Sequence, residues 1–178
     1  LIAETAWHHQ GQESFMLKLI DSLCSSKVDC IKIHMLLDID EYMLPDHSLY
    51  TKLKDWMLPE KCWEKIIGKI HDSGKKFIVL CNDKKSVDFA LDHHADGLEL
   101  HAATVHDVHL LNHLTQKFYG KGKHLFVGVG ALQIDEIDAL YHINSTKLTL
   151  MFGIQNFPTK PEHIALARQR RLMGLYPK

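Results

Sequence analysis

Leu1-Ile-Ala-Glu-Thr-Ala-Trp-His-His-Gln-Gly11 opens the chain with a short apolar run and ends in a polar turn that contains two histidines. Apolar residues then recur at helical spacing over residues 13–24, so an amphipathic helix follows at once. This order predicts a buried strand that delivers Glu4, His8 and His9 to its carboxyl end. Parallel α/β folds place their functional residues at that end of the strands.

The rest of the chain repeats this strand–helix plan. Further strands are expected at 28–35, 77–81, 97–101, 125–129 and 147–152, each followed by a helical pattern. Thr104 is the expected N-cap of the helix after the fourth strand. The last helix is expected to open at Pro161 and to stop at Gly174. Six alternating units of this kind indicate a parallel sheet covered by helices.

Two architectures fit this alternation: a doubly wound open sheet, and a (βα)8 barrel of which about six units are present. Lys32 and His34 share one face of the second strand, and Glu99 and His101 share one face of the fourth. In an open sheet, helices on both faces would bury these polar pairs, whereas in a barrel the pairs would point into the lumen. We therefore expect a single, partial TIM-barrel domain over residues 1–178.

The composition is that of an ordinary globular protein, with 46% hydrophobic residues, 24% charged residues and a formal net charge of −1. This balance does not suggest a nucleic acid or an anionic membrane as a partner. No apolar run approaches the roughly 20 residues of a membrane span, and no signal peptide is visible. The four cysteines form no CxxC pair, which is typical of reduced thiols, and we expect a cytoplasmic protein.

A charged and aromatic segment, residues 36–59, separates the second strand from its helix and is too long for a tight connection. Insertions of this kind often carry binding residues or cover a site.

Several segments, in this order and spacing, resemble the sialic acid synthases. They are Ile2-Ala-Glu4 with His9-Gln-Gly11, Asp29-Cys-Ile-Lys32-Ile-His34, Ser86-Val-Asp-Phe89, Gly128-Val-Gly130 with Ile134-Asp-Glu136-Ile, and Asn156-Phe-Pro158-Thr-Lys-Pro161. The resemblance implies a (βα)8 barrel that condenses phosphoenolpyruvate with N-acetylmannosamine or a related sugar. It also implies a divalent metal, Mn or Mg, and a homodimer. The family's histidine metal ligands would lie past Lys178, and nothing in this sequence corresponds to the family's C-terminal antifreeze-like domain.

The sequence departs from the family at positions that serve phosphoenolpyruvate. On the fourth strand and the turn after it, the family carries a lysine, a serine and an acid where this chain has Glu99, Ala102 and Thr104. A serine–threonine step at the end of the third strand is replaced by Val79-Leu80, and the serine of the fifth-strand turn by Gly128. Gly128-Val-Gly130 could instead let a phosphate approach the backbone.

Glu4 and Lys32 are the candidate catalytic residues, because a glutamate and a lysine on neighbouring strands would pair and tune each other's pKa. The alternative is an ion pair of purely structural role. The candidate substrate-binding residues follow strands or lie on the same polar faces: His9, His34, Glu99, His101, Gln155 and Asn156. His9 could instead bond the backbone of its turn, and Gln155 and Asn156 could instead cap one.

His34, Glu99 and His101 could also hold zinc, manganese or iron if they converge with Glu4, since two imidazoles and a carboxylate suit these ions. A hydrogen-bonded polar plug is the alternative. Three functions therefore remain open from the sequence: a sialic acid synthase-like enzyme, a degenerate barrel that binds a sugar or a partner protein, and a metal-dependent lyase or isomerase.

Overall fold

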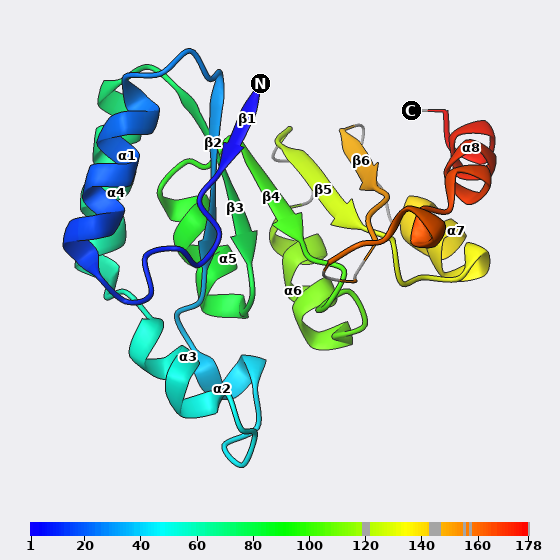
Figure 1. The fold of residues 1–178 in the computed structure, drawn as a ribbon, viewed down its shortest axis with the longest axis horizontal. Coiled ribbons are helices and arrows are strands. Elements are labelled where there is room, and N and C mark those ends of the chain that lie inside the picture. Colours follow the sequence, from blue (N-terminus) through cyan, green and yellow to red (C-terminus); the bar gives the residue numbers. More distant parts are fainter. Residues whose placement is uncertain (119–121, 143–146, 155, 157, 178) are drawn as a thin grey trace. The chain divides into compact units, whose positions relative to one another are not determined.

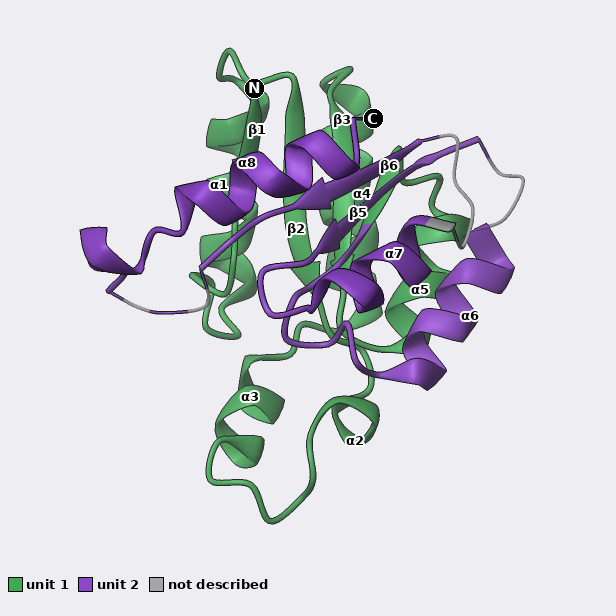
Figure 2. Ribbon diagram, turned by 90° about the vertical axis from the view of Figure 1, so that its right-hand side faces the viewer, with its two compact units in different colours: residues 1–98 green, residues 99–178 purple. Residues whose placement is uncertain are grey.

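The computed structural model describes residues 1–118, 122–142, 147–154, 156 and 158–177. The chain divides into two compact units, Leu1–Leu98 and Glu99–Lys178, which Figure 2 colours green and purple. The strands neighbour one another in chain order, from β1 to β6, and helices alternate with them (Figure 1). The α/β alternation expected from the sequence is therefore confirmed.

The first unit contains three complete parallel strands. Residues Ile2, Ala3 and Glu4 of β1 pair with Cys30, Ile31 and Lys32 of β2, and β2 pairs along its whole length with β3. Its elements are β1 (Ile2–Glu4), α1 (Glu13–Cys24), β2 (Cys30–Met35), α2 (Ile39–Tyr42), α3 (Tyr50–Trp56), α4 (Glu60–Asp72), β3 (Lys76–Cys81) and α5 (Lys84–Asp92). β4 (Gly97–Leu100) begins at the end of this unit and runs into the second.

Alternation along β2 separates the core of the first unit from its polar face. Ile31, Ile33 and Met35 are completely buried, whereas Lys32 and His34 between them are half-buried. The helix α4 contributes a buried stripe that includes Trp63 and packs against α1 and β3. The apolar face of the sheet is thus covered by helices, and the opposite face of β2 carries the polar side chains.

The second unit contains α6 (Val108–Phe118), β5 (His124–Gly128), α7 (Ile134–His142), β6 (Leu148–Met151), a 3-10 helix (Pro161–His163) and α8 (Leu166–Leu175). The strands β5 and β6 are parallel, with Gly128 opposite Met151. No helix in the described ranges has the length and apolar character that a membrane crossing needs.

Two glycines of the second unit are packing positions. A Cβ at Gly128 would lie 2.6 Å from the backbone nitrogen of Ala102, and one at Gly130 would lie 2.0 Å from the carbonyl oxygen of Gly153. Only glycine leaves room for these backbone approaches. The Gly128-Val-Gly130 pattern is thus explained by packing, without a phosphate.

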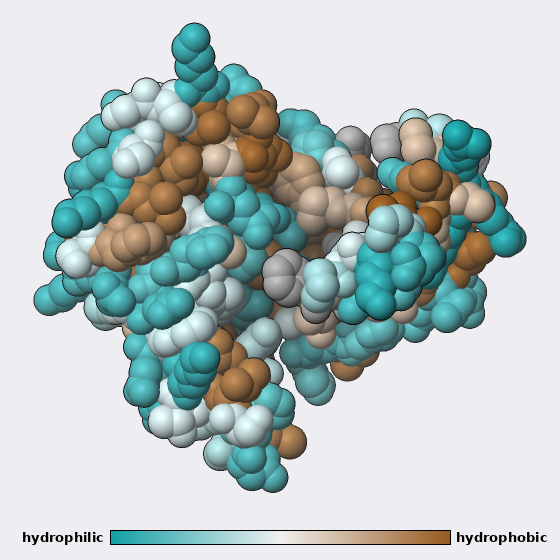
Figure 3. All heavy atoms as spheres, viewed as in Figure 1, coloured by the Kyte–Doolittle hydropathy of each residue, from teal (hydrophilic) through white to brown (hydrophobic). Residues whose placement is uncertain are grey.

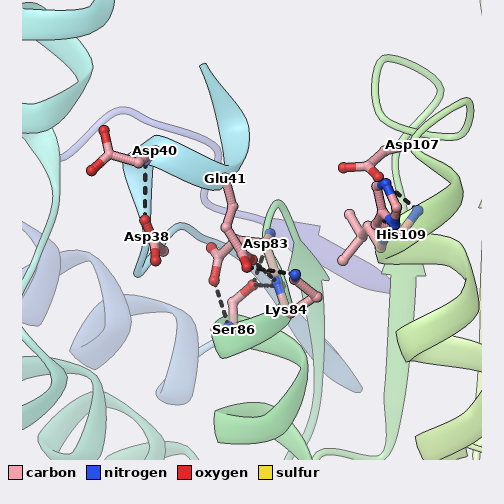
Figure 4. Close-up of polar contacts among 9 residues, drawn as sticks. Asp38, Asp40, Glu41, Asp83, Lys84, Ser86, Asp107 and His109 are labelled. Carbon is pink, nitrogen blue, oxygen red and sulfur yellow. Dashed lines mark hydrogen bonds and ion pairs between the residues drawn. The ribbon is translucent and has the colours of Figure 1, made fainter. Parts of the chain in front are cut away.

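Three predicted helix ends are wrong. Asp107, not Thr104, caps α6: its Oδ1 accepts hydrogen bonds from the backbone N–H groups of His109 and Leu110 (Figure 4). Thr104 instead closes the preceding turn, donating its hydroxyl to the carbonyl oxygen of His101. Pro161 opens only the short 3-10 helix, and α8 begins at Leu166 and continues through Gly174 to Leu175.

Candidate functional site

One carboxylate is held by two basic side chains at the carboxyl end of β1. Glu4 lies opposite Lys32 in the parallel register of β1 and β2. Its Oε2 lies 2.5 Å from the Nζ of Lys32, and its Oε1 lies 2.9 Å from the Nε2 of His34. Each carboxylate oxygen therefore has its own nitrogen partner, and the predicted pairing of Glu4 with Lys32 is present.

The two partners differ from Glu4 in their exposure to solvent. The Glu4 side chain is 43% exposed, whereas those of Lys32 and His34 are 14% and 12% exposed. The hydrogen bond from His34 and the bond and charge of Lys32 lower the pKa of Glu4 from 4.5 to about 2, against the opposing effect of burial. Glu4 is therefore ionised at any physiological pH.

The turn after β1 is organised around His9, whose side chain is almost fully buried. Its Nδ1 accepts a hydrogen bond from the backbone N–H of Gly11, 3.1 Å away, so the neutral ring carries its proton on Nε2. Among the described residues, that Nε2 has no hydrogen-bond partner, and the ring stands edge-to-face with Trp63. Burial, aided by the charge of His34, lowers the pKa of His9 from 6.5 to about 4. The backbone-bonding role that the sequence left open for His9 is present.

This turn is strained and tightly packed. Ala6, Gln10 and Gly11 all have positive φ angles, of 46°, 46° and 79°, a region that residues other than glycine rarely adopt. A Cβ at Gly11 would lie 2.4 Å from the carbonyl oxygen of Asp55 and 3.1 Å from the Cα of Trp56. The backbone of α3 therefore packs directly on the turn that follows Glu4.

The inserted segment 36–59 forms α2 and α3 and is anchored at its amino-terminal end. The carboxylate of Asp83 accepts hydrogen bonds from the backbone N–H groups of Leu37 and Ser86, which joins this segment to the start of α5. Figure 4 shows Asp83 with Ser86. Glu41 forms an ion pair of 2.8 Å with the Nζ of Lys84 and also accepts from its backbone N–H. Burial raises the pKa of Asp83, and the hydrogen bonds that it accepts from Leu37 and Ser86 oppose that rise.

The insertion also presents apolar side chains to solvent. Leu44 is 73% exposed and Leu49 is 47% exposed. Figure 3 shows brown, apolar atoms among hydrophilic ones over the part of the surface that α2 and α3 occupy. The insertion thus exposes apolar side chains, while the end of α3 contacts the turn that follows Glu4.

Glu99 and His101 belong to the second unit. Glu99, on β4, is 2% exposed. His101, just after β4, is half-buried, and its Nδ1 accepts from the backbone N–H of Ala103 at 3.2 Å. That these two side chains converge with the Glu4 cluster stays a prediction.

Asn156 follows β6, as predicted. Its Nδ2 lies 2.6 Å from the Nδ1 of His163, and its carbonyl oxygen accepts from the hydroxyl of Thr159. These bonds fit the turn-stabilising role that the sequence left open for it. Gln155 lies outside the described residues.

Within the described ranges, no three His, Cys, Asp or Glu side chains are grouped so that they could hold a metal ion. Both oxygens of Glu4 face nitrogen partners that carry protons, which does not suit a metal ligand. A divalent metal therefore stays a prediction of the resemblance, and no step of the chemistry below is assigned to one. The proposed roles of His34, Glu99 and His101 as metal ligands stay predictions.

Sequence reasoning missed two residues that shape this site. Thr5 is buried, and its backbone N–H and hydroxyl both donate to the carbonyl oxygen of Lys32. Trp63 packs against the ring of His9 from α4. The sequence shows a helical pattern after residue 59, but it does not show which apolar residue of that helix would contact the turn.

These features define an α/β protein with a charged cluster at the carboxyl end of its first two strands. The chain belongs to the NeuB family, whose sequence profile matches residues 19–177. That range contains Lys32 and His34 but begins after Glu4. A search among curated proteins found no match.

Solved structures with the same fold share little sequence with this chain. A putative spore coat polysaccharide biosynthesis protein E from Chromobacterium violaceum is 20% identical, with a TM-score of 0.82; the match covers 98% of this chain and 55% of that one. The N-acetylneuraminic acid (sialic acid) synthetase from Leptospira borgpetersenii is 17% identical, with a TM-score of 0.85 and coverages of 98% and 61%. The Bacillus subtilis spore coat polysaccharide biosynthesis protein spsE is 16% identical, with a TM-score of 0.78; the match covers 99% of this chain and 49% of that one. The chain thus spans about half to three-fifths of these proteins.

Proposed function

We propose that this chain belongs to a TIM-barrel enzyme that condenses phosphoenolpyruvate with N-acetylmannosamine or a related sugar. Membership of the NeuB family supports a synthase-like role in sugar biosynthesis. The observation that carries the proposal is the Glu4–Lys32–His34 cluster, because it puts an acid and two basic groups at the carboxyl ends of neighbouring strands. A homodimer and a cytoplasmic location belong to the same proposal.

In this reaction, Lys32 would hold an anionic group of phosphoenolpyruvate. Its side chain is 14% exposed, so an anion there would be only partly screened by water. Glu4 would hold or deprotonate a hydroxyl of the sugar. With a pKa of about 2 it is a poor base while both of its nitrogen partners remain bound. The carboxylate must therefore leave them before it can accept a proton.

The test is release of inorganic phosphate from phosphoenolpyruvate. Purified protein with manganese and a panel of N-acyl-mannosamines should release phosphate only when a sugar is present. The Lys32→Met variant should lose this activity, and Lys65→Met, which changes an exposed lysine on α4, should keep it. Absence of sugar-dependent phosphate release with every sugar would refute the proposal.

A second candidate is a barrel that binds a sugar or a partner protein without synthase chemistry. Four positions where the resemblance predicts ligands for phosphoenolpyruvate favour it. Val79 and Leu80 are buried apolar residues, and Glu99 is a buried acid. At Gly128, the backbone of Ala102 leaves no room for the expected serine.

Calorimetry separates the two candidates. The synthase should bind phosphoenolpyruvate and the sugar, whereas the degenerate barrel should bind a sugar and give no heat with phosphoenolpyruvate. Binding of phosphoenolpyruvate at micromolar concentration would exclude the second candidate.

A further inference from the structure

Glu4 occupies the position in which the Lys32–His34 pair would bind an anion. The two basic side chains lie two residues apart on one face of β2, and each contacts a different oxygen of the same carboxylate. A carboxylate or a phosphate presents the same pair of oxygens. The pair therefore forms a two-point clamp whose geometry also suits the anionic group of a ligand.

The members of the cluster differ in how far each could move. Lys32 and His34 are largely buried and lie within a strand that is paired on both sides. Glu4 is the last residue of β1, and its side chain is 43% exposed. It could turn into solvent, where water would hydrate its carboxylate, whereas the clamp would keep its place.

We propose that Glu4 is an internal competitor for the anion site formed by Lys32 and His34, and that a ligand's carboxylate or phosphate group binds by displacing it. This inference rests on the proposed function only in placing the substrate's anionic group at Lys32. The exchange keeps a negative group beside the half-buried nitrogen atoms throughout. Leaving Lys32 without a counter-charge would be costly in this environment.

The displacement has a consequence for the order of binding. Once an anion holds Lys32 and His34, the Glu4 carboxylate is released from both and its pKa rises towards its ordinary 4.5. It then becomes able to accept a hydrogen bond, or a proton, from a sugar hydroxyl. The anionic substrate therefore binds first and prepares Glu4 for the second substrate.

The test is a titration with inorganic phosphate at constant ionic strength and pH 7, followed by isothermal calorimetry. Removing the competitor in Glu4→Gln should tighten phosphate binding roughly tenfold, as expected for the loss of one charge-assisted hydrogen-bonding group from the closed state. The matched control is Glu13→Gln, which removes the same charge from an exposed pair with Lys65, 2.8 Å apart. It should leave phosphate affinity unchanged.

Phosphate binding by Glu4→Gln that is as weak as in the parent chain, weaker, or undetectable would overturn the inference. Tighter binding that persists in the double variant Glu4→Gln/Lys32→Met would also overturn it, because the phosphate would then lie elsewhere. If Glu4→Gln does not fold, Glu4→Asp serves instead. The shorter aspartate side chain reaches Lys32 and His34 less well, so Glu4→Asp should also bind phosphate more tightly than the parent chain. The titration measures phosphate binding and no turnover. Failure of the proposed reaction would therefore be seen separately, in the phosphate-release assay.

Discussion

Replacing Glu4 by glutamine should lower the free energy of unfolding at pH 7 by about 1–2 kcal/mol. In the folded chain the pKa of Glu4 falls from 4.5 to about 2, through the hydrogen bond from His34 first and the bond and charge of Lys32 second. At about 1.4 kcal/mol per pH unit, this drop would correspond to roughly 3 kcal/mol in an unscreened site. The 43% exposure of the Glu4 side chain weakens both contacts, and the lower range follows from that screening.

The lowered pKa of Glu4 also determines how the stability that it contributes depends on pH. A carboxyl whose pKa is lowered on folding stabilises the native state fully above the unfolded-state pKa. That stabilisation is lost as the pH falls through the native-state pKa. The difference in stability between the parent chain and Glu4→Gln should therefore stay constant from neutral pH to about pH 5. It should shrink between pH 4.5 and about 2.

Urea unfolding followed by tryptophan fluorescence at several pH values measures this difference. Glu13→Gln is the matched control: its partner Lys65 is 61% exposed, whereas Lys32 is 14% exposed, so breaking this pair should cost much less than breaking the Glu4 pair. Equal stability of Glu4→Gln and the parent chain at pH 7 would refute the reasoning. So would a difference that is unchanged at about pH 3, since protonation should have removed much of it by then.

Three further predictions concern the turn after β1 and the glycines. Gly11→Ala should destabilise the chain by about 2–4 kcal/mol, because its Cβ would overlap the backbone of α3; Gly74→Ala, with a similar φ but open space, should cost about 1 kcal/mol in the same urea assay. Gly128→Ser should lower the melting temperature and should not increase phosphate affinity. In Gly68→Ala, on α4, the added Cβ would contact no other atom, so this variant should have a slightly higher melting temperature. Burial depresses the pKa of His9 to about 4, so the native state should lose about 1–2 kcal/mol as the pH falls from 6.5 towards 4. His9→Asn, measured by urea unfolding at both ends of that range, should lose less, and an identical slope would count against the assignment.

Local patterns in the sequence were enough to predict the polar face of β2. Lys32 and His34 alternate with apolar residues, so period-two reasoning placed them together. The position of Glu4 at the end of the preceding strand then predicted its pairing with Lys32. These relations depend only on strand geometry and on the short step between neighbouring parallel strands.

The contacts that shape the turn could not be predicted in this way. Gly11 is required because the backbone of Asp55, forty-four residues later, lies against it. Nothing in the local sequence distinguishes this glycine from an ordinary turn residue. The predicted N-cap of α6 was wrong for a different reason: Thr104 and Asp107 are both acceptable N-cap residues. In the structure Thr104 bonds back to His101, and Asp107 accepts from the first turn of the helix.

An internal competitor would also set how strongly an anion must be attracted before it binds. A ligand must displace a carboxylate whose oxygens already lie 2.5 Å and 2.9 Å from their nitrogen partners. A monoanionic carboxylate offers the clamp nothing that Glu4 does not, and it gives up its freedom in solution to bind. A phosphate dianion carries about twice the charge at a similar distance and would be attracted correspondingly more strongly. A phosphate dianion should therefore bind more tightly than acetate. Because Glu4 competes with every anion for the same two side chains, its removal in Glu4→Gln should raise the affinities for phosphate and for acetate by the same factor and leave their ratio unchanged; a ratio that changes tenfold would contradict simple competition.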